Sequence, residues 1–136
     1  MKQVVTALAV FTFVVVSSMA ALAADDASIP EAVKDRARTA MEEFIKHEVE
    51  VKGAFLLVDK DENKTLSLNY DKLHKGMVKF QDGYLACADF NAGKSAYDID
   101  FLVKEVGGHY RVVKAAVHSV DGKKRTPREV ARDWVT

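Results

Sequence analysis

Residues 84–105 read YLACADFNAGKSAYDIDFLVKE, and this stretch decides the fold. Two runs rich in apolar side chains, 84–90 and 95–105, flank the turn-forming segment 91–94. In the second run the residues DIDF at 98–101 alternate polar and apolar side chains, as in a strand with one covered face. The stretch therefore predicts two antiparallel strands joined by a hairpin turn.

Runs of the same kind lie on both sides of this hairpin. The further expected strands are 54–60, 65–70, 77–80 and 109–120. Asp82-Gly83 and Gly107-Gly108 mark two more tight turns, because these residues tolerate positive φ angles. The pattern predicts an up-and-down antiparallel sheet.

Two capping-box patterns predict helices at the two ends of the domain. Ser28 to Glu31 reads SIPE, and apolar side chains then recur at three- and four-residue spacing to about Glu48. Thr126 to Glu129 reads TPRE and predicts a short C-terminal helix through Trp134.

The first 23 residues have the features of a secretory signal. Lys2 precedes an apolar run from Val4 to Val16, and the small-x-small pattern of Ala21-Leu22-Ala23 suits signal peptidase. We expect a signal peptide at 1–23, a single domain at 24–136, and a periplasmic or secreted protein. The residue directly after the cleavage point is Ala24 and not cysteine, which argues against a lipoprotein, and no later segment is expected to span a membrane.

Composition narrows the range of partners. The chain has 20 Lys and Arg against 20 Asp and Glu, so no net charge favours nucleic acid. Cys87 is the only cysteine, which excludes an intrachain disulfide, and its alanine neighbours favour a buried thiol over an exposed one.

The expected elements combine into an α+β fold, with the N-terminal helix packed across a curled antiparallel sheet and a short C-terminal helix. This element order, with YDIDF at 97–101 and VHSVDGK at 117–123, resembles the cystatin-like superfold, including PepSY-type and ketosteroid-isomerase-like domains. No Gln-x-Val-x-Gly hairpin is present, which argues against the protease inhibition of the cystatins.

Strand register suggests where chemistry could occur. With Ala92-Gly93 as the turn centre, Cys87 lies opposite Asp98, and both Asp98 and Asp100 share one face with Asp89. Crowded carboxylates suit a general base or a hard-cation site. The alternative is a solvated face on which the acids pair with Lys104, Arg111 or loop residues.

His118 is a third candidate catalytic residue. Counting from the Gly107-Gly108 turn places it beside Tyr97, on the face opposite the aspartates. A partly buried imidazole there needs a hydrogen-bond partner, for which Tyr97 is the nearest candidate.

A possible metal loop lies at Asp59-x-Asp61-x-Asn63, which resembles the opening of a calcium loop. Lys64 stands where that loop needs glycine, and Tyr70 stands where it needs a bidentate glutamate. A solvated turn is the favoured interpretation.

We expect an exported, non-catalytic binding or accessory module of the cell envelope, without a cofactor. Its partner would be a protein or a small molecule, and it would act as a monomer or homodimer. The alternative is a ketosteroid-isomerase-like enzyme with an aspartate or His118 in a cone-shaped pocket, and a third possibility is metal handling at the 59–63 turn.

Overall fold

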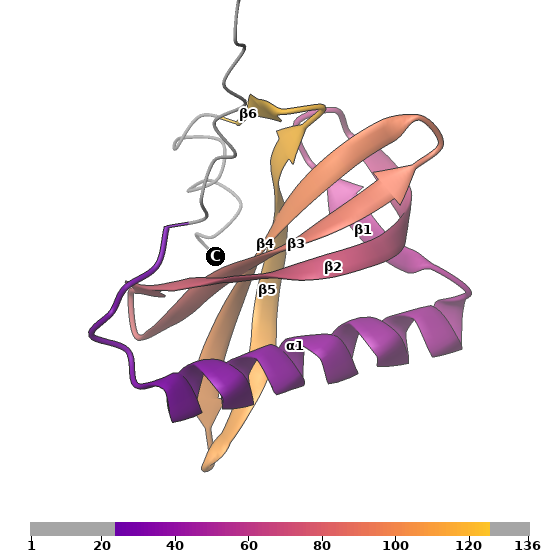
Figure 1. Ribbon diagram of the computed structural model, residues 1–136. Coiled ribbons are helices and arrows are strands. Elements are labelled where there is room, and N and C mark those ends of the chain that lie inside the picture. The colour runs from indigo at the N-terminus through magenta and orange to yellow at the C-terminus, as the bar shows by residue number, and fades with distance from the viewer. Residues whose placement is uncertain (1–23, 126–136) are drawn as a thin grey trace, which may run out of the picture.

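The computed structural model describes residues 24–125 (Figure 1). The elements in chain order are α1 (Glu31–Lys52), β1 (Phe55–Asp59), β2 (Lys64–Phe80), β3 (Gly83–Ala92), β4 (Ser95–Val106), β5 (His109–Val120) and β6 (Lys123–Lys124). The strands form one antiparallel sheet in the order β1-β2-β3-β4-β5-β6, so the predicted up-and-down topology is confirmed.

Helix α1 runs across one face of the strongly curved sheet (Figure 1). Its buried residues Ala37, Met41 and Ile45 recur every four positions and pack into the main core. From the sheet, Ile99 and Phe101 of β4 enter the same core and are completely buried. The helix therefore covers the face that carries the odd-numbered residues of this part of β4.

Both ends of α1 differ from the prediction. The helix begins at Glu31 after Pro30, and no side chain caps it. The Ser28 hydroxyl accepts a hydrogen bond from Lys79 Nζ at 2.9 Å, which leaves the predicted capping box unformed. The helix continues to Lys52 and stops at Gly53, whose φ of 80° is readily adopted only by glycine.

Strand β2 joins two segments that were predicted as separate strands. It spans 17 residues, pairing first with β1 and then with β3. Its register against β3 shifts between Tyr70 and Lys72 and again between Leu73 and Met77. These irregularities let one strand bend between two partners.

The outer strands of the sheet are tied together by charge. Arg125, directly after β6, pairs with Asp59 at the end of β1 through an Nη2–Oδ2 contact of 2.7 Å. Arg125 also binds Asp61. Because β1 and β6 are the two ends of the strand order, this contact holds the curled sheet closed.

The predicted fold class is wrong. The described chain is mostly strand, arranged as a six-stranded antiparallel sheet with one helix at 31–52, and this overturns the expected cystatin-like α+β fold. The physical reason is the long β2 and the curl of the sheet, which make strands the main component. The coarser combination of a helix with an antiparallel sheet holds.

Two predicted segments lie outside the described residues: the signal peptide at 1–23 and the C-terminal helix at 126–134. Within residues 24–125, no helix has the length and apolar character needed to cross a membrane.

Candidate metal centre

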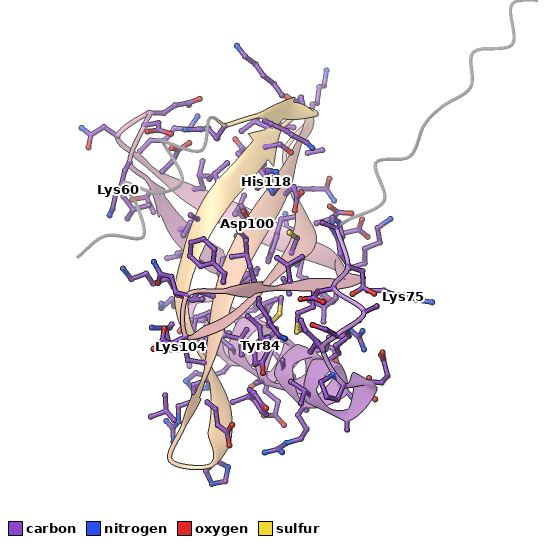
Figure 2. All side chains as sticks on the ribbon, turned by 90° about the vertical axis from the view of Figure 1, so that its left-hand side faces the viewer. Lys60, Lys75, Tyr84, Asp100, Lys104 and His118 are labelled. Atoms are coloured by element: carbon purple, nitrogen blue, oxygen red, sulfur yellow. The ribbon has the colours of Figure 1, made fainter. Side chains whose placement is uncertain are left out.

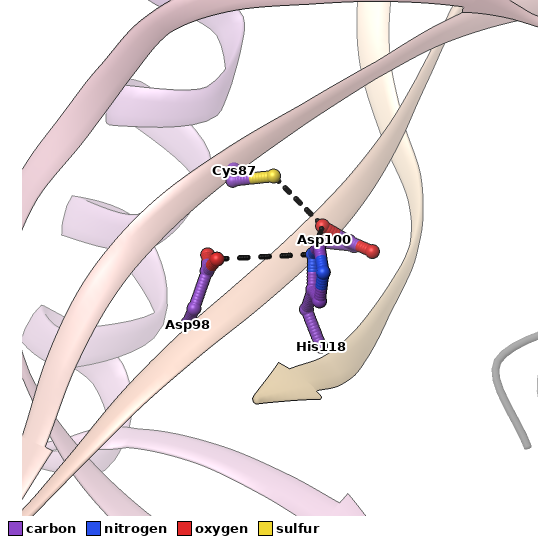
Figure 3. A group of neighbouring side chains, drawn as sticks. All are labelled: Cys87, Asp98, Asp100 and His118. Atoms are coloured by element: carbon purple, nitrogen blue, oxygen red, sulfur yellow. Dashed lines mark hydrogen bonds and ion pairs between the residues drawn. The ribbon is translucent and has the colours of Figure 1, made fainter. Parts of the chain in front are cut away.

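Four side chains with metal-binding atoms meet on the sheet face opposite α1 (Figure 3). Cys87 comes from β3, Asp98 and Asp100 from β4, and His118 from β5. Their donor atoms all lie within 4.8 Å of one another. Three neighbouring strands thus build one compact cluster, which we call the CDDH cluster.

The β3–β4 hairpin brings the first three residues together. Cys87 lies opposite Asp100 and Asp89 lies opposite Asp98, a shift of two residues from the predicted register. The turn is centred on Gly93-Lys94 and not on Ala92-Gly93. A two-residue shift leaves each side chain on its original face, so the predicted shared face of the three aspartates is confirmed.

Two irregularities in β5 decide the position of His118. Val103 pairs with Val112 but Leu102 pairs with Lys114, so Val113 is an extra residue. This bulge exchanges the faces of residues 114–118 and moves His118 to the face of the aspartates. His118 is itself the extra residue of the second irregularity, which lies between the pairs Ile99–Val117 and Asp98–Ser119. The prediction that His118 lies beside Tyr97 on the opposite face is therefore wrong.

Asp100 is the hub of the CDDH cluster. Its Oδ1 accepts a hydrogen bond from the Cys87 thiol at 2.7 Å, and His118 Nδ1 lies 2.9 Å from the same oxygen. His118 Nδ1 also lies 3.7 Å from Asp98 Oδ2. The other oxygen of Asp98, Oδ1, is buried and accepts no hydrogen bond from the residues that the structure describes.

The cluster is sheltered from solvent, and its ionisation reflects this. Asp100 is 3% exposed. Burial, followed by the charge of Asp100, raises the pKa of the Cys87 thiol far above its usual range. Burial also raises the pKa of Asp98, whereas the hydrogen bond to Asp100 raises that of His118. A thiol held in its protonated form is a poor nucleophile.

Lys104 does not neutralise these acids. It binds Asp82 instead, and Figure 2 places it well apart from Asp100 and His118 along the sheet. The alternative that the aspartates pair with Lys104 is therefore wrong.

The 59–63 turn is separate from the cluster and has a different partner. Asp59 and Asp61 both bind the Arg125 guanidinium, so a protein cation occupies the position that a calcium ion would need. Asn63 adopts a φ of 48° in the β1–β2 turn. Burial is the largest single influence on the pKa of Asp59, and it raises this pKa. The hydrogen bonds from Arg125 and from the backbone together outweigh burial, so the pKa lies below its usual value.

A cavity of about 940 Å³ opens beside the CDDH cluster. Asp98 and Ser119 line it together with His74, Asp89, Lys72 and Lys124. Its lining is thus rich in charged groups, which suits a polar or ionic ligand better than an apolar one.

Sequence reasoning missed two contributors to this face. Cys87 was expected only as a buried thiol, and His74 belongs to no ligand-spacing motif, because the four histidines (47, 74, 109 and 118) are dispersed along the chain. The alternation of side chains in the β3–β4 hairpin could have identified Cys87, because it places the thiol on the same face as the aspartates. His74 lies in the irregular part of β2, where alternation carries no such signal.

Comparisons with protein-family models, curated proteins and solved structures found no match for this chain. The residues of the CDDH cluster therefore supply the argument for function.

Proposed function

We propose that the protein is an exported, non-catalytic binding module whose ligand is a divalent metal ion of the zinc type. Cys87, Asp98, Asp100 and His118 are the proposed ligands. The observation that carries the proposal is the convergence of one sulfur, one imidazole nitrogen and two carboxylate groups within 4.8 Å. Export rests on the signal-like residues 1–23.

The spacing of the donor atoms supports a small tetrahedral ion. Zinc binds sulfur, nitrogen and oxygen at distances that separate neighbouring ligands by about 3.3 to 3.7 Å. The contacts within the cluster span 2.7 Å for Cys87–Asp100 to 3.7 Å for His118–Asp98. An ion entering the cluster needs Cys87 and Asp100 to move apart and any donors that lie up to 4.8 Å apart to move closer together.

The kinds of donor atom narrow the choice of ion. Calcium and magnesium take oxygen ligands, whereas thiolate and imidazole favour zinc and its transition-metal neighbours. A bound cation also deprotonates a coordinating thiol. The metal would therefore relieve the repulsion that Cys87 and the aspartates experience when they ionise together.

One observation favours a second candidate, an enzyme that abstracts a proton with Asp98. Burial raises the pKa of this carboxyl, as a general base at neutral pH requires. The charged lining of the adjoining cavity does not suit an apolar substrate. The metal-binding proposal gives a role to all four residues of the cluster, whereas the enzyme hypothesis gives a role to Asp98 alone.

Zinc titration tests the proposed function. We expect Zn²⁺ at 100 times its dissociation constant to stabilise the protein by about 2.7 kcal/mol, which corresponds to a rise in melting temperature of about 10 °C or more. Cys87→Ser and His118→Ala should each remove most of this rise, because each deletes a ligand.

His109→Ala is the matched control, since it removes an exposed imidazole at the first residue of β5. It should keep the full response to zinc. No rise with Zn²⁺, or an equal rise with Ca²⁺, would contradict the proposed function.

A further inference from the structure

The CDDH cluster adjoins a second group of possible ligands on the same face. His74 of β2 and Asp89 of β3 lie next to Asp98, and the donor atoms of these three residues are within 4.8 Å of one another. His74 Nε2 lies 2.8 Å from Asp89 Oδ1. Asp98 belongs to both groups, so a row of ligands crosses four strands from β2 to β5.

Asp98 has two oxygens with different surroundings. Its Oδ2 lies 3.7 Å from His118, within the CDDH cluster. Its Oδ1 is buried and receives no hydrogen bond within residues 24–125. A buried carboxylate oxygen without a partner is costly, and a cation is one partner that removes this cost.

Charge balance points the same way. Asp98, Asp100 and a metal-bound Cys87 thiolate carry three negative charges, and Asp89 adds a fourth. One divalent ion leaves this face negative, whereas two divalent ions neutralise the four charges. Without metal, Lys72 Nζ lies 3.7 Å from Asp89 Oδ2 with its side chain 67% exposed, and Lys124 lines the adjoining cavity.

We propose that this face binds a second divalent transition-metal ion, held by His74 and Asp89 and bridged by Asp98 to the ion of the CDDH cluster. This inference rests on the proposed function. The second ion has no sulfur ligand, and water from the adjoining cavity completes its coordination. Lys72 moves aside into solvent when the ion binds.

The two positions differ in their access to solvent. The side chain of Asp89 is 32% exposed, whereas that of Asp100 is 5% exposed. The second ion therefore binds more weakly and exchanges faster than the first. The inner ion is the tightly held ligand of the proposed function, and the outer ion is the one that exchanges readily.

The experiment counts cobalt(II) ions bound by the purified protein, using equilibrium dialysis with metal analysis and absorption spectroscopy. Co²⁺ is the probe because thiolate ligation gives it an intense charge-transfer band that nitrogen and oxygen ligands do not. We expect two ions per chain. The first produces the thiolate band, and the second adds only weak absorption.

The combined variant His74→Ala, Asp89→Asn should reduce the count from two to one and keep the thiolate band. His109→Ala combined with Asp71→Asn is the matched control, because Asp71 lines the same cavity without belonging to either ligand group. It should still bind two ions. If the first variant does not fold, cobalt titration of the unmodified protein decides. The thiolate band should be complete after the first equivalent of cobalt, and the second equivalent should add only weak absorption.

The possible results separate the two proposals. One ion with the thiolate band overturns the second position and leaves the proposed function intact. Two ions in the His74, Asp89 variant also overturn the second position. No bound cobalt overturns both proposals.

Discussion

Asp98 is a carboxylate placed beside two others on one sheltered face of the sheet. Asp89 lies directly opposite it, and Asp100 follows two residues later on the same strand. Burial and the repulsion of these neighbours raise its pKa, although the two histidines nearby act in the other direction. The charged form of Asp98 is therefore disfavoured in the metal-free protein.

Asp98→Asn should stabilise the metal-free protein by about 1 kcal/mol, the size of a unit-charge repulsion near 4 Å in a well-hydrated setting. The same change should weaken zinc binding, because an amide is a poorer ligand than a carboxylate. Chemical denaturation with and without EDTA measures both effects. Asp71→Asn, at an exposed position on β2, is the control and should change neither. A destabilised Asp98→Asn protein would instead indicate a structural network.

At the level of the secondary-structure element, β5 determines which residues share the candidate site. Its extra residue Val113 exchanges the faces of residues 114–118, and Val113 is 44% exposed. Lys114 already lies opposite Leu102, so removing Val113 leaves the later pairs as they are.

Deletion of Val113 should therefore give a folded protein that still binds zinc, with His118 beside Asp100. Circular dichroism and zinc titration check this outcome. Deletion of Ala88 is the contrasting variant, because β3 pairs regularly with β4 and has no bulge there to absorb the loss. It should abolish folding or zinc binding. Loss of binding in the Val113 deletion would show that the bulge itself shapes the site.

The positions of most strands were predictable because alternation of side chains and turn-forming residues are local features. The face shared by Asp89, Asp98 and Asp100 followed from the parity of one hairpin. The position of His118 was not predictable, because the sequence around Val113 contains no residue pattern that indicates a bulge there. The length of β2 was also missed, because its irregular middle lacks alternation.

Considered as a whole, the molecule is a curled sheet whose ends are tied by Arg125 and Asp59. Asp59 is 3% exposed, so its charge depends on this guanidinium and on backbone hydrogen bonds. The pKa of Asp59 is lower in the folded protein than its reference value of 3.8. Its stabilising contribution is present above pH 3.8 and is lost as the pH falls through the folded-state value.

Arg125→Ala should reduce the free energy of unfolding at pH 7 by about 3 kcal/mol, because it leaves a buried carboxylate without its cation. The pKa of Asp59 should then rise, since burial is no longer opposed by Arg125. The difference from the unmodified protein should therefore begin to shrink at the raised pKa of Asp59 in the variant, above 3.8, and shrink further as the pH falls towards the lowered pKa in the unmodified protein.

Guanidinium denaturation from pH 3 to pH 7 measures this difference. Lys123→Ala removes an exposed cation from β6 and should have little effect at any pH in this range. A loss of stability in Arg125→Ala that is independent of pH would contradict the role given to Asp59.

The bulge in β5 also has a consequence for the recognition of distant relatives. A homologue without the extra residue would place its imidazole one position nearer the glycine turn and yet keep it over the same carboxylates. An alignment that forbids gaps inside strands would then match His118 with the homologue's equivalent of Ser119, the residue paired with Asp98. Searches for kin of this chain should allow a single-residue gap at position 113.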